Sequence, residues 1–466
     1  MQLSEMRSGK SIFRVSILKS FVTMAVLASS FLATTSQQGY AIPAFARKYG
    51  LPCSACHIGW PILNVFGQQF RDNGFQLGNE RDAPIYQNPS YWPITFRVLP
   101  QWHLESQTKV PIDQTNSEQT VTTHGFDLSG LDIWTAGTLY KNISFSVLPA
   151  MAEGDSFHFE NAWVRFDNLL NSPWLNVKLG KFELDTLLSE KRFLTLSGVG
   201  GEWLNYHFLP VGDSNGFGGI GDNQLGIELS GHNKNSYARY SIALLSSVDG
   251  NPGLTTSNAG TPYPNTARTY DVFANVNEGF QVRGLGVQRV GVYGYFGQTP
   301  TYYLTSEDVP VEGKGNRSFS RVGAYGWWFI KDFDVETLYM HGQDNVYLGN
   351  GIAVNDPAGL PPGAAGPAWN GGFIEAHYAY SPQLIFTGRY ELVHMSRQAN
   401  PTLAATPNVG NIDSWTIGYR WYPIMFSRAG LAFHNEYSQA KTGNTSILTG
   451  SDQTIRSVMI GFDFDY

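Results

Sequence analysis

Two cysteines and a histidine stand together as Cys53-Ser54-Ala55-Cys56-His57, and no other cysteine occurs in the 466 residues. This C-x-x-C-H spacing is that of a c-type haem attachment site, in which both thiols bond the porphyrin and the adjoining imidazole binds its iron. The spacing therefore predicts one covalent haem c, with Cys53 and Cys56 as thioether sites and His57 as the proximal axial ligand.

Other interpretations of the same cluster are a short disulfide between Cys53 and Cys56, a thioredoxin-like redox pair, or half of a zinc site. Zinc would need a fourth ligand besides these three residues, and the neighbouring sequence offers no second paired cluster. Haem attachment is the favoured interpretation, and a Cys53–Cys56 disulfide is the main alternative.

A secretory leader is predicted over residues 1–41. A basic region precedes an apolar stretch from Phe21 to Ala33, and Gly39-Tyr40-Ala41 fits the small-x-small cleavage rule. The mature chain would begin at Ile42, and we expect it to leave the cytoplasm.

The composition indicates a membrane wall made of strands. Charged residues are only 15% of the chain, aromatic residues reach 14%, and there are 50 glycines. After the leader no run approaches the roughly 18 to 20 apolar residues that a spanning helix needs, which excludes a helical membrane protein. The net charge of -7 argues against a nucleic-acid partner and mildly favours attraction of cations.

Alternation with a period of two runs through the chain from Ile94 to Tyr466. In the last segment Val458, Ile460, Phe462, Phe464 and Tyr466 share one face, while Met459, Gly461, Asp463 and Asp465 share the other. An aromatic carboxy-terminal strand of this kind is typical of outer-membrane barrels. We predict an all-β fold, a transmembrane antiparallel barrel of about 16 strands over residues 91–466.

The predicted connections alternate in length, which is the outer-membrane arrangement. Short turns are expected at 141–142, 168–173, 231–236, 277–279, 331–332, 381–383 and 422–427. Longer loops are expected at 184–221, 247–268, 298–317, 342–370 and 395–412. A soluble β-sandwich is the alternative, but it does not explain the terminal aromatic residue or the repeated short turns.

A small helical haem-bearing segment, residues 42–90, precedes the barrel. A helix is predicted from Pro61 to Phe70, with Ile62, Val65 and Phe66 on one face and Gly74 ending it. Fewer than fifty residues cannot enclose a porphyrin alone, so another surface must complete the pocket. An even strand number brings both barrel ends to the periplasmic mouth, and we expect the segment to plug the barrel from there.

The entry segment resembles that of the outer-membrane cytochrome-porin fusions of iron(II)-oxidising bacteria. The resemblance rests on Ala44-Phe45-Ala46-Arg47, Cys53 to His57, Trp60-Pro61, Leu63-Asn64, Phe66-Gly67, Phe70 and Asn73-Gly74-Phe75. Over the barrel it is one of architecture only. It implies a single-haem domain joined to a porin-like barrel, with Cys53 and Cys56 as attachment sites and His57 as proximal ligand.

The spacing of the attachment motif does not identify a distal haem ligand. By strand parity His103 and His434 both face the lumen, in the outward half of the first and fifteenth strands. His103 is the first choice for a metal ligand, and His207 in the 184–221 loop is a further candidate.

Charged residues supply further candidates. Inward-facing arginines could hold haem propionates or simply line a wet channel: Arg97, Arg165, Arg239, Arg321, Arg389 and Arg420. Loop aspartates could receive iron(II) or simply form turns: Asp213, Asp222, Asp344 and Asp356.

These patterns predict an outer-membrane electron-transfer protein with no hydrolase machinery. It would carry electrons between an extracellular donor, foremost iron(II), and a periplasmic c-type cytochrome or other soluble carrier. The alternatives are a diffusion porin with a haem-bearing plug, and an outward conduit or extracellular reductase, because the sequence does not fix the direction of electron flow.

Overall fold

The computed structural model describes residues 45, 48–59, 62–77, 93–113, 115, 117–151, 157–186, 223–246, 255–256, 262–263, 270–299, 303–304, 310–311, 317–343, 368–397, 411–425, 430–442 and 452–465. The predicted leader, residues 1–41, lies outside the described residues, as do Trp60 and Pro61.

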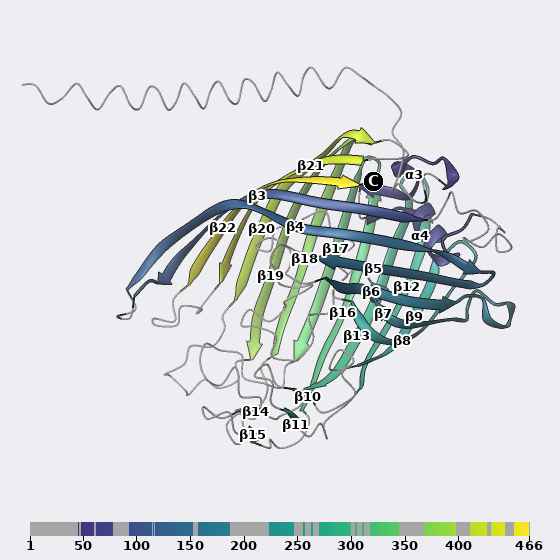
Figure 1. Cartoon of the computed structure of the whole chain (residues 1–466), viewed down its shortest axis with the longest axis horizontal. Helices are drawn as coiled ribbons and strands as arrows, with labels where there is room; N and C mark the ends of the chain where they lie inside the picture. Colours follow the sequence, from purple (N-terminus) through teal and green to yellow (C-terminus); the bar gives the residue numbers. More distant parts are fainter. Residues whose placement is uncertain are drawn as a thin grey trace, which may run out of the picture. The chain divides into compact units, whose positions relative to one another are not determined.

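Sixteen antiparallel strands form one closed barrel, as predicted (Figure 1). In chain order they are β3 (Ile94–Pro111), β4 (Glu118–Tyr140), β5 (Ile143–Met151), β6 (His158–Phe166), β7 (Asn176–Phe182), β8 (Gln224–His232), β9 (Ala238–Ser246), β12 (Tyr270–Val282), β13 (Gly286–Thr299), β16 (Arg317–Ile330), β17 (Phe333–Gln343), β18 (Ala368–Ser381), β19 (Leu384–Arg397), β20 (Ile412–Met425), β21 (Gly430–Thr442) and β22 (Gln453–Asp465). Each strand pairs with its neighbours in sequence, and β22 closes the ring by pairing with β3.

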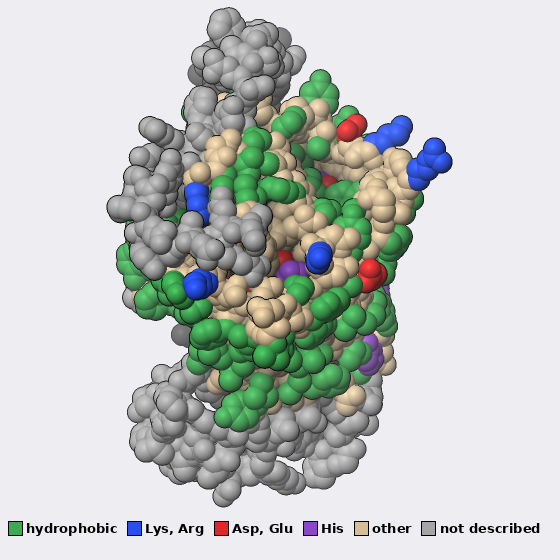
Figure 2. Space-filling model, turned by 90° about the vertical axis from the view of Figure 1, so that its right-hand side faces the viewer, with side chains coloured by type: hydrophobic (Ala, Val, Ile, Leu, Met, Phe, Trp, Pro, Cys, Tyr) green, Lys and Arg blue, Asp and Glu red, His purple; other side chains and the backbone are tan. Residues whose placement is uncertain are grey.

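Period-two alternation separates the two faces of the wall as predicted. On β22, Ile460 and Phe464 are 41% and 44% exposed, whereas Met459 and Asp463 are buried inside. Figure 2 shows hydrophobic side chains spread over one face of the barrel, with only a few charged groups among them. A closed sheet with an apolar exterior satisfies every backbone group internally and suits a lipid surround.

Short turns join the strands at one end of the barrel. Predicted turns at 141–142, 331–332 and 381–383 are confirmed by the gaps between β4 and β5, β16 and β17, and β18 and β19. The turn predicted at 277–279 is wrong, because β12 continues to Val282 and the chain reverses at 283–285. Gly284 and Gly286 have φ of +81° and +96° there, a conformation that glycine adopts without strain.

Longer connections lie at the opposite end. They carry two small hairpins, β10 (Thr255–Thr256) with β11 (Pro262–Tyr263) and β14 (Tyr303–Leu304) with β15 (Pro310–Val311). In Figure 1 these hairpins lie at the end of the barrel away from the purple amino-terminal elements. Long and short connections therefore segregate as the alternation predicts.

The amino-terminal segment folds as α3 (Cys53–Cys56), β1 (His57–Gly59), β2 (Ile62–Leu63) and α4 (Val65–Asp72). The helix predicted from Pro61 begins later, at Val65, because Ile62 and Leu63 pair with β1 and Asn64 caps the helix. Gly74, with φ of +77°, follows the helix end as predicted. Of the helices that the structure describes, none has the length and apolar character needed to cross a membrane.

Inside the barrel, the half nearer the long connections is lined by an inner aromatic cluster. Its buried members include Phe273, Tyr293, Tyr295, Phe319, Tyr325, Trp369 and Phe373. Alternation of the strands sorts residues to the two faces, but it does not say that an inward face is apolar. Tertiary packing instead gives this part of the lumen an apolar core.

Candidate haem site and its seat in the barrel

The attachment motif folds as one helical turn followed by a buried histidine. Cys53 and Cys56 begin and end α3. Cys56 is a free thiol whose pKa burial raises to about 11. His57, only 7% exposed, begins β1 directly after them.

Asn64 ties the motif to helix α4. Its Oδ1 accepts a hydrogen bond from the backbone N–H of Gly67 at 2.9 Å, which caps the helix. Its Nδ2 donates to the carbonyls of Ser54 at 3.2 Å and Ala55 at 3.0 Å. One side chain therefore fixes both the helix start and the backbone of the attachment turn.

Gly67 brings α4 into direct contact with the same turn. A Cβ built on Gly67 would overlap the carbonyl oxygen of Cys56 far inside van der Waals contact. Glycine at this position is therefore required by close packing of backbone on backbone.

The hairpin of β1 and β2 packs against the inner wall near the short turns. Ile62 is buried in a cluster with Ile385 of β19, Tyr422 and Met425 of β20, and Ala432 of β21. Ile58 and Trp327 border this cluster, and Trp327 also borders the inner aromatic cluster. Trp327 thus connects the amino-terminal segment to the apolar lumen.

Aromatic rings hold the other side of the segment. Phe45 packs edge-on against Phe70 with ring centroids 5.0 Å apart, and it meets Trp134 of β4 at 5.8 Å. Phe75 stacks on Trp163 of β6 at 6.1 Å. The segment therefore contacts inner faces on widely separated parts of the barrel wall.

Ion pairs and hydrogen bonds surround the end of α4. Arg239 of β9 lies 3.0 Å from Asp72 and 2.7 Å from Asp185, and all three side chains are at most 10% exposed. Arg165 of β6 donates to the carbonyls of Arg71 and Asp72 at 2.9 and 3.2 Å. These buried contacts fix the position of α4 against β6 and β9.

The predicted distal ligand, His103, makes no described contact with the Cys53–His57 motif. His103 lies midway along β3, one-third exposed, with its Nδ1 2.7 Å from Asp127 Oδ2. His434 is nearer, two residues along β21 from Ala432, which packs against the segment. It lies in the short-turn half of β21, so its predicted place in the outward half is wrong.

Both of these histidines already have polar neighbours. The Nδ1 of His434 accepts a hydrogen bond from Arg420 Nε at 3.1 Å, and its Nε2 lies 3.1 Å from Glu436 Oε1. A third inward histidine, His377, was missed. It is buried between Asp334 and Glu375, 2.7 Å from each, and strand parity alone could have identified it.

The six predicted arginines all lie on inner faces, mostly with acidic partners. Arg97 binds Asp463 at 2.9 and 2.7 Å, and Arg389 binds Glu375 and Glu391 at 2.8 and 2.7 Å. Arg165 pairs with Asp167 at 2.5 Å. Arg321 and Arg420 bind a backbone carbonyl and His434 respectively. Arg289 of β13 was not among the candidates.

Several predicted residues lie outside the described part of the chain: His207, Asp213, Asp222, Asp344 and Asp356. Within the described residues, no group of three or more His, Cys, Asp or Glu side chains could hold a metal ion. A landing site for iron(II) stays a prediction.

The residues of the segment fit a covalent haem c. Two cysteines occupy one turn of helix, His57 follows, and Gly67 makes room for the attachment turn by lacking a side chain. Cys53 and Cys56 would hold the porphyrin and His57 its iron.

No family model matches this chain, and no curated protein matches it. Among solved structures, it is similar to an anion-selective porin from Comamonas acidovorans, with 12% identity, a TM-score of 0.49, and coverage of 80% of this chain and 99% of that one. It is also similar to OmpT of Vibrio cholerae, with 11% identity, a TM-score of 0.44, and coverage of 80% and 97%. OprB of Pseudomonas putida matches with 10% identity, a TM-score of 0.42, and coverage of 79% and 94%.

The class of the protein follows from its own strands. A closed barrel of sixteen strands, with an apolar exterior and with short turns and long loops at opposite ends, is an outer-membrane β-barrel of porin-like architecture. The protein therefore belongs in the bacterial outer membrane.

Proposed function

We propose that this protein is an outer-membrane electron-transfer protein that carries one covalent haem c inside a porin-like barrel. It moves electrons between an extracellular donor, foremost iron(II), and a periplasmic c-type cytochrome. The observation that carries the proposal is that the β1–β2 hairpin, which directly follows the Cys53–Cys56 turn, packs through Ile58 and Ile62 against the inner wall of a membrane barrel.

The chemistry follows from the need to cross an insulator. The hydrocarbon layer is about 25 to 30 Å thick and does not conduct electrons. A haem bound at Cys53 and Cys56 supplies a one-electron carrier within that layer or at its edge. The donor would approach from the long loops, and the periplasmic carrier would dock at the short-turn mouth.

The chain's own residues have distinct tasks in this proposal. Cys53 and Cys56 tether the cofactor, and His57 binds its iron from a buried position. Ile58 and Ile62, packed on Ile385 and Ala432, exclude water from that side. His103 is the proposed distal ligand, and His434 is the alternative that lies nearer the segment.

A diffusion porin with a structural plug is the second candidate. Paired charges on the inner wall, such as Arg97 with Asp463 and Lys178 with Glu228, favour it because porin lumens are polar. In that case the haem would be dispensable for transport.

The two candidates are separated by adding iron(II) to the purified protein and following haem reduction by stopped-flow absorbance. We expect reduction in the wild type and in Ser54→Ala, and no redox signal in Cys56→Ala, which should still fold as a barrel. If haem is present but iron(II) does not reduce it at acid or neutral pH, iron(II) is not the donor. If Cys56→Ala and wild type transport solutes equally and iron(II) reduces the haem of neither, the porin candidate stands.

A further inference from the structure

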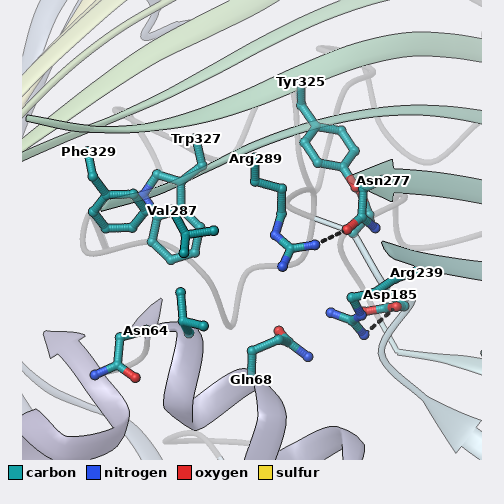
Figure 3. Close-up of a pocket in the computed structure, with 12 residues that line it drawn as sticks. Asn64, Gln68, Asp185, Arg239, Asn277, Val287, Arg289, Tyr325, Trp327 and Phe329 are labelled. Carbon is teal, nitrogen blue, oxygen red and sulfur yellow. Dashed lines mark hydrogen bonds and ion pairs between the residues drawn. The ribbon is translucent and has the colours of Figure 1, made fainter. Parts of the chain in front are cut away.

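A pocket lies between the first turn of α4 and the barrel wall (Figure 3). Its cavity volume is about 40 Å³, so it is small and could take only the edge of a larger ligand. Asn64 and Gln68 border it from the segment, and Arg239, Arg289, Trp327 and Phe329 border it from the strands. The same Asn64 binds the carbonyls of the attachment turn, so the pocket directly adjoins the motif.

One side of the pocket is apolar. Trp327 and Phe329 present rings whose centroids are 4.9 Å apart and whose planes are tilted by 40°, and Val287 lies beside them (Figure 3). Trp327 is fixed in orientation because its Nε1 donates to Asp334 at 3.0 Å. The apolar part of a ligand would meet aromatic rings here.

The other side is polar and carries charges of both signs, with Arg239, Arg289 and Asp185 among its lining residues. In Figure 3 the guanidinium groups of Arg239 and Arg289 both lie at the pocket's polar end. Arg239 is bound by Asp72 and Asp185. Arg289 differs, since its described acceptors are all neutral: the amide oxygen of Asn277 and the carbonyls of Tyr237 and Ser236, at 3.2 and 2.8 Å for the carbonyls.

The amino-terminal end of α4 also favours an anion. The first turn of a helix carries N–H groups with no intrahelical partner, and Asn64 caps that of Gly67. A small pocket with an apolar wall, and with an arginine whose described acceptors are all neutral, suits the carboxylate edge of an apolar ligand.

We propose that this pocket takes the carboxylate edge of the haem, with Arg289 as the partner of a propionate. The inference rests on the proposed function, because it needs the haem tethered at Cys53 and Cys56. Arg289 is a positioning residue: it fixes the ionised propionate and adds a positive charge near the porphyrin. A free carboxylate or phosphate ion shares the recognition chemistry and is the alternative source of the anion.

The test compares the midpoint potential of Arg289→Gln with that of wild type in the holoprotein, from pH 5 to 9. Oxidised haem carries one more positive charge than reduced haem, so a nearby guanidinium disfavours the oxidised form more. Loss of that charge stabilises the oxidised haem, and the midpoint potential should therefore fall. We expect a fall of roughly threefold to tenfold in the ratio of reduced to oxidised haem at a fixed poise. Arg289→Lys should retain most of the wild-type value.

The matched control is Arg283→Gln, which removes the same charge from the exposed β12–β13 turn. It should leave the potential unchanged. If Arg289→Gln and Arg283→Gln give the same potential at every pH, the propionate assignment is wrong while the covalent haem stands. If wild type itself carries no haem, the proposed function fails as well.

Inorganic phosphate distinguishes the two sources of the anion. A potential that varies with phosphate concentration in wild type, and not in Arg289→Gln, would show a free-anion site and overturn the proposal. We expect no such variation. If Arg289→Gln does not fold, the wild type can be measured alone. Redox-difference infrared spectra of haem labelled at the propionates should show an ionised carboxylate throughout pH 5 to 9. A protonated carboxyl in that range would contradict the proposal.

Discussion

Gly67 is the residue at which the attachment turn and helix α4 are closest. In an open helix position, alanine is favoured over glycine by about 1 kcal/mol. Here the added methyl would meet the Cys56 carbonyl, and such overpacking costs about 1 to 3 kcal/mol. The clash should therefore outweigh the gain in helix propensity.

We expect Gly67→Ala to lower the ratio of haem to protein, measured by the pyridine haemochrome method. Gly388→Ala is the matched control, because a Cβ at Gly388 meets no atom within 4 Å. Equal haem content in the two variants would show that α4 does not pack on the attachment turn in this way.

Substitution of His103 and of His434 can show which of the two is the distal haem ligand. Loss of the true ligand should convert a six-coordinate low-spin haem to a high-spin form, visible in the absorbance spectrum. The sequence-based choice predicts this change in His103→Ala and not in His434→Ala. The reverse result would favour His434, which lies nearer the segment, and an unchanged spectrum in both would exclude the pair.

The haem-binding residues could be predicted because they are close together in the sequence. Cys53, Cys56 and His57 lie within five residues, and their spacing alone indicates a shared role. Arg289 could not be selected in that way, because its distinction lies in neutral partners contributed by the β8–β9 turn and by β12. Pairing of this kind depends on strand register, which a single sequence does not state.

Helix α4 is held to the barrel by its last turn. Asp72 accepts from Gln68 at 2.9 Å and pairs with Arg239 at 3.0 Å, all in buried surroundings. Removing one partner of a buried pair leaves the other charge uncompensated and typically costs about 3 to 5 kcal/mol. Asp185 also binds Arg239, which should reduce that cost.

We expect Asp72→Asn to loosen the segment without unfolding the barrel. The measurement is the rate of limited proteolysis between residues 42 and 93, which should rise several-fold. Asp452→Asn, which breaks the exposed pair with Lys441, should leave the rate unchanged. If both variants resist cleavage like wild type, α4 is not anchored by this ion pair.

The elements show where local patterns succeed and where they fail. The start of α4 was predicted four residues early because Ile62 and Val65 share a helical face, but Asn64 caps the helix and the preceding residues pair with β1. Likewise Asn277 and Gly279 suggested a turn, yet alternation continues through them to Val282. Turn-forming residues are tolerated in a strand when both neighbours supply a full ladder of hydrogen bonds.

The whole barrel depends on an exterior that faces lipid. Ile417, near the middle of β20, is 56% exposed on that surface. A lysine near the bilayer midplane costs about 2 to 4 kcal/mol. Ile417→Lys should therefore unfold at a lower urea concentration in lipid vesicles than Thr122→Lys, which adds the same charge to an exposed position toward the far end of β4. Equal midpoints would contradict a lipid-facing wall.

Strand number and the sorting of residues to the two faces were predictable, because period-two alternation is a direct consequence of strand geometry. The packing of the inner aromatic cluster could not be predicted in this way. Tyr293 and Tyr295 were inward by parity, but parity does not say whether an inward residue meets water or another ring. Tyr293 packs 6.4 Å from Tyr325 and Tyr295 packs 5.9 Å from Phe319, across neighbouring strands.

The central claim is that one polypeptide forms a membrane barrel and carries a haem bonded to Cys53 and Cys56 within it. The most direct test is the intact mass of the mature protein, purified in detergent from outer membranes, together with its visible spectrum. The account predicts a mass greater than that of the polypeptide by one haem, retained on denaturation, with the absorbance of a c-type cytochrome. A mass equal to the bare polypeptide, with no iron-porphyrin absorbance, would contradict it.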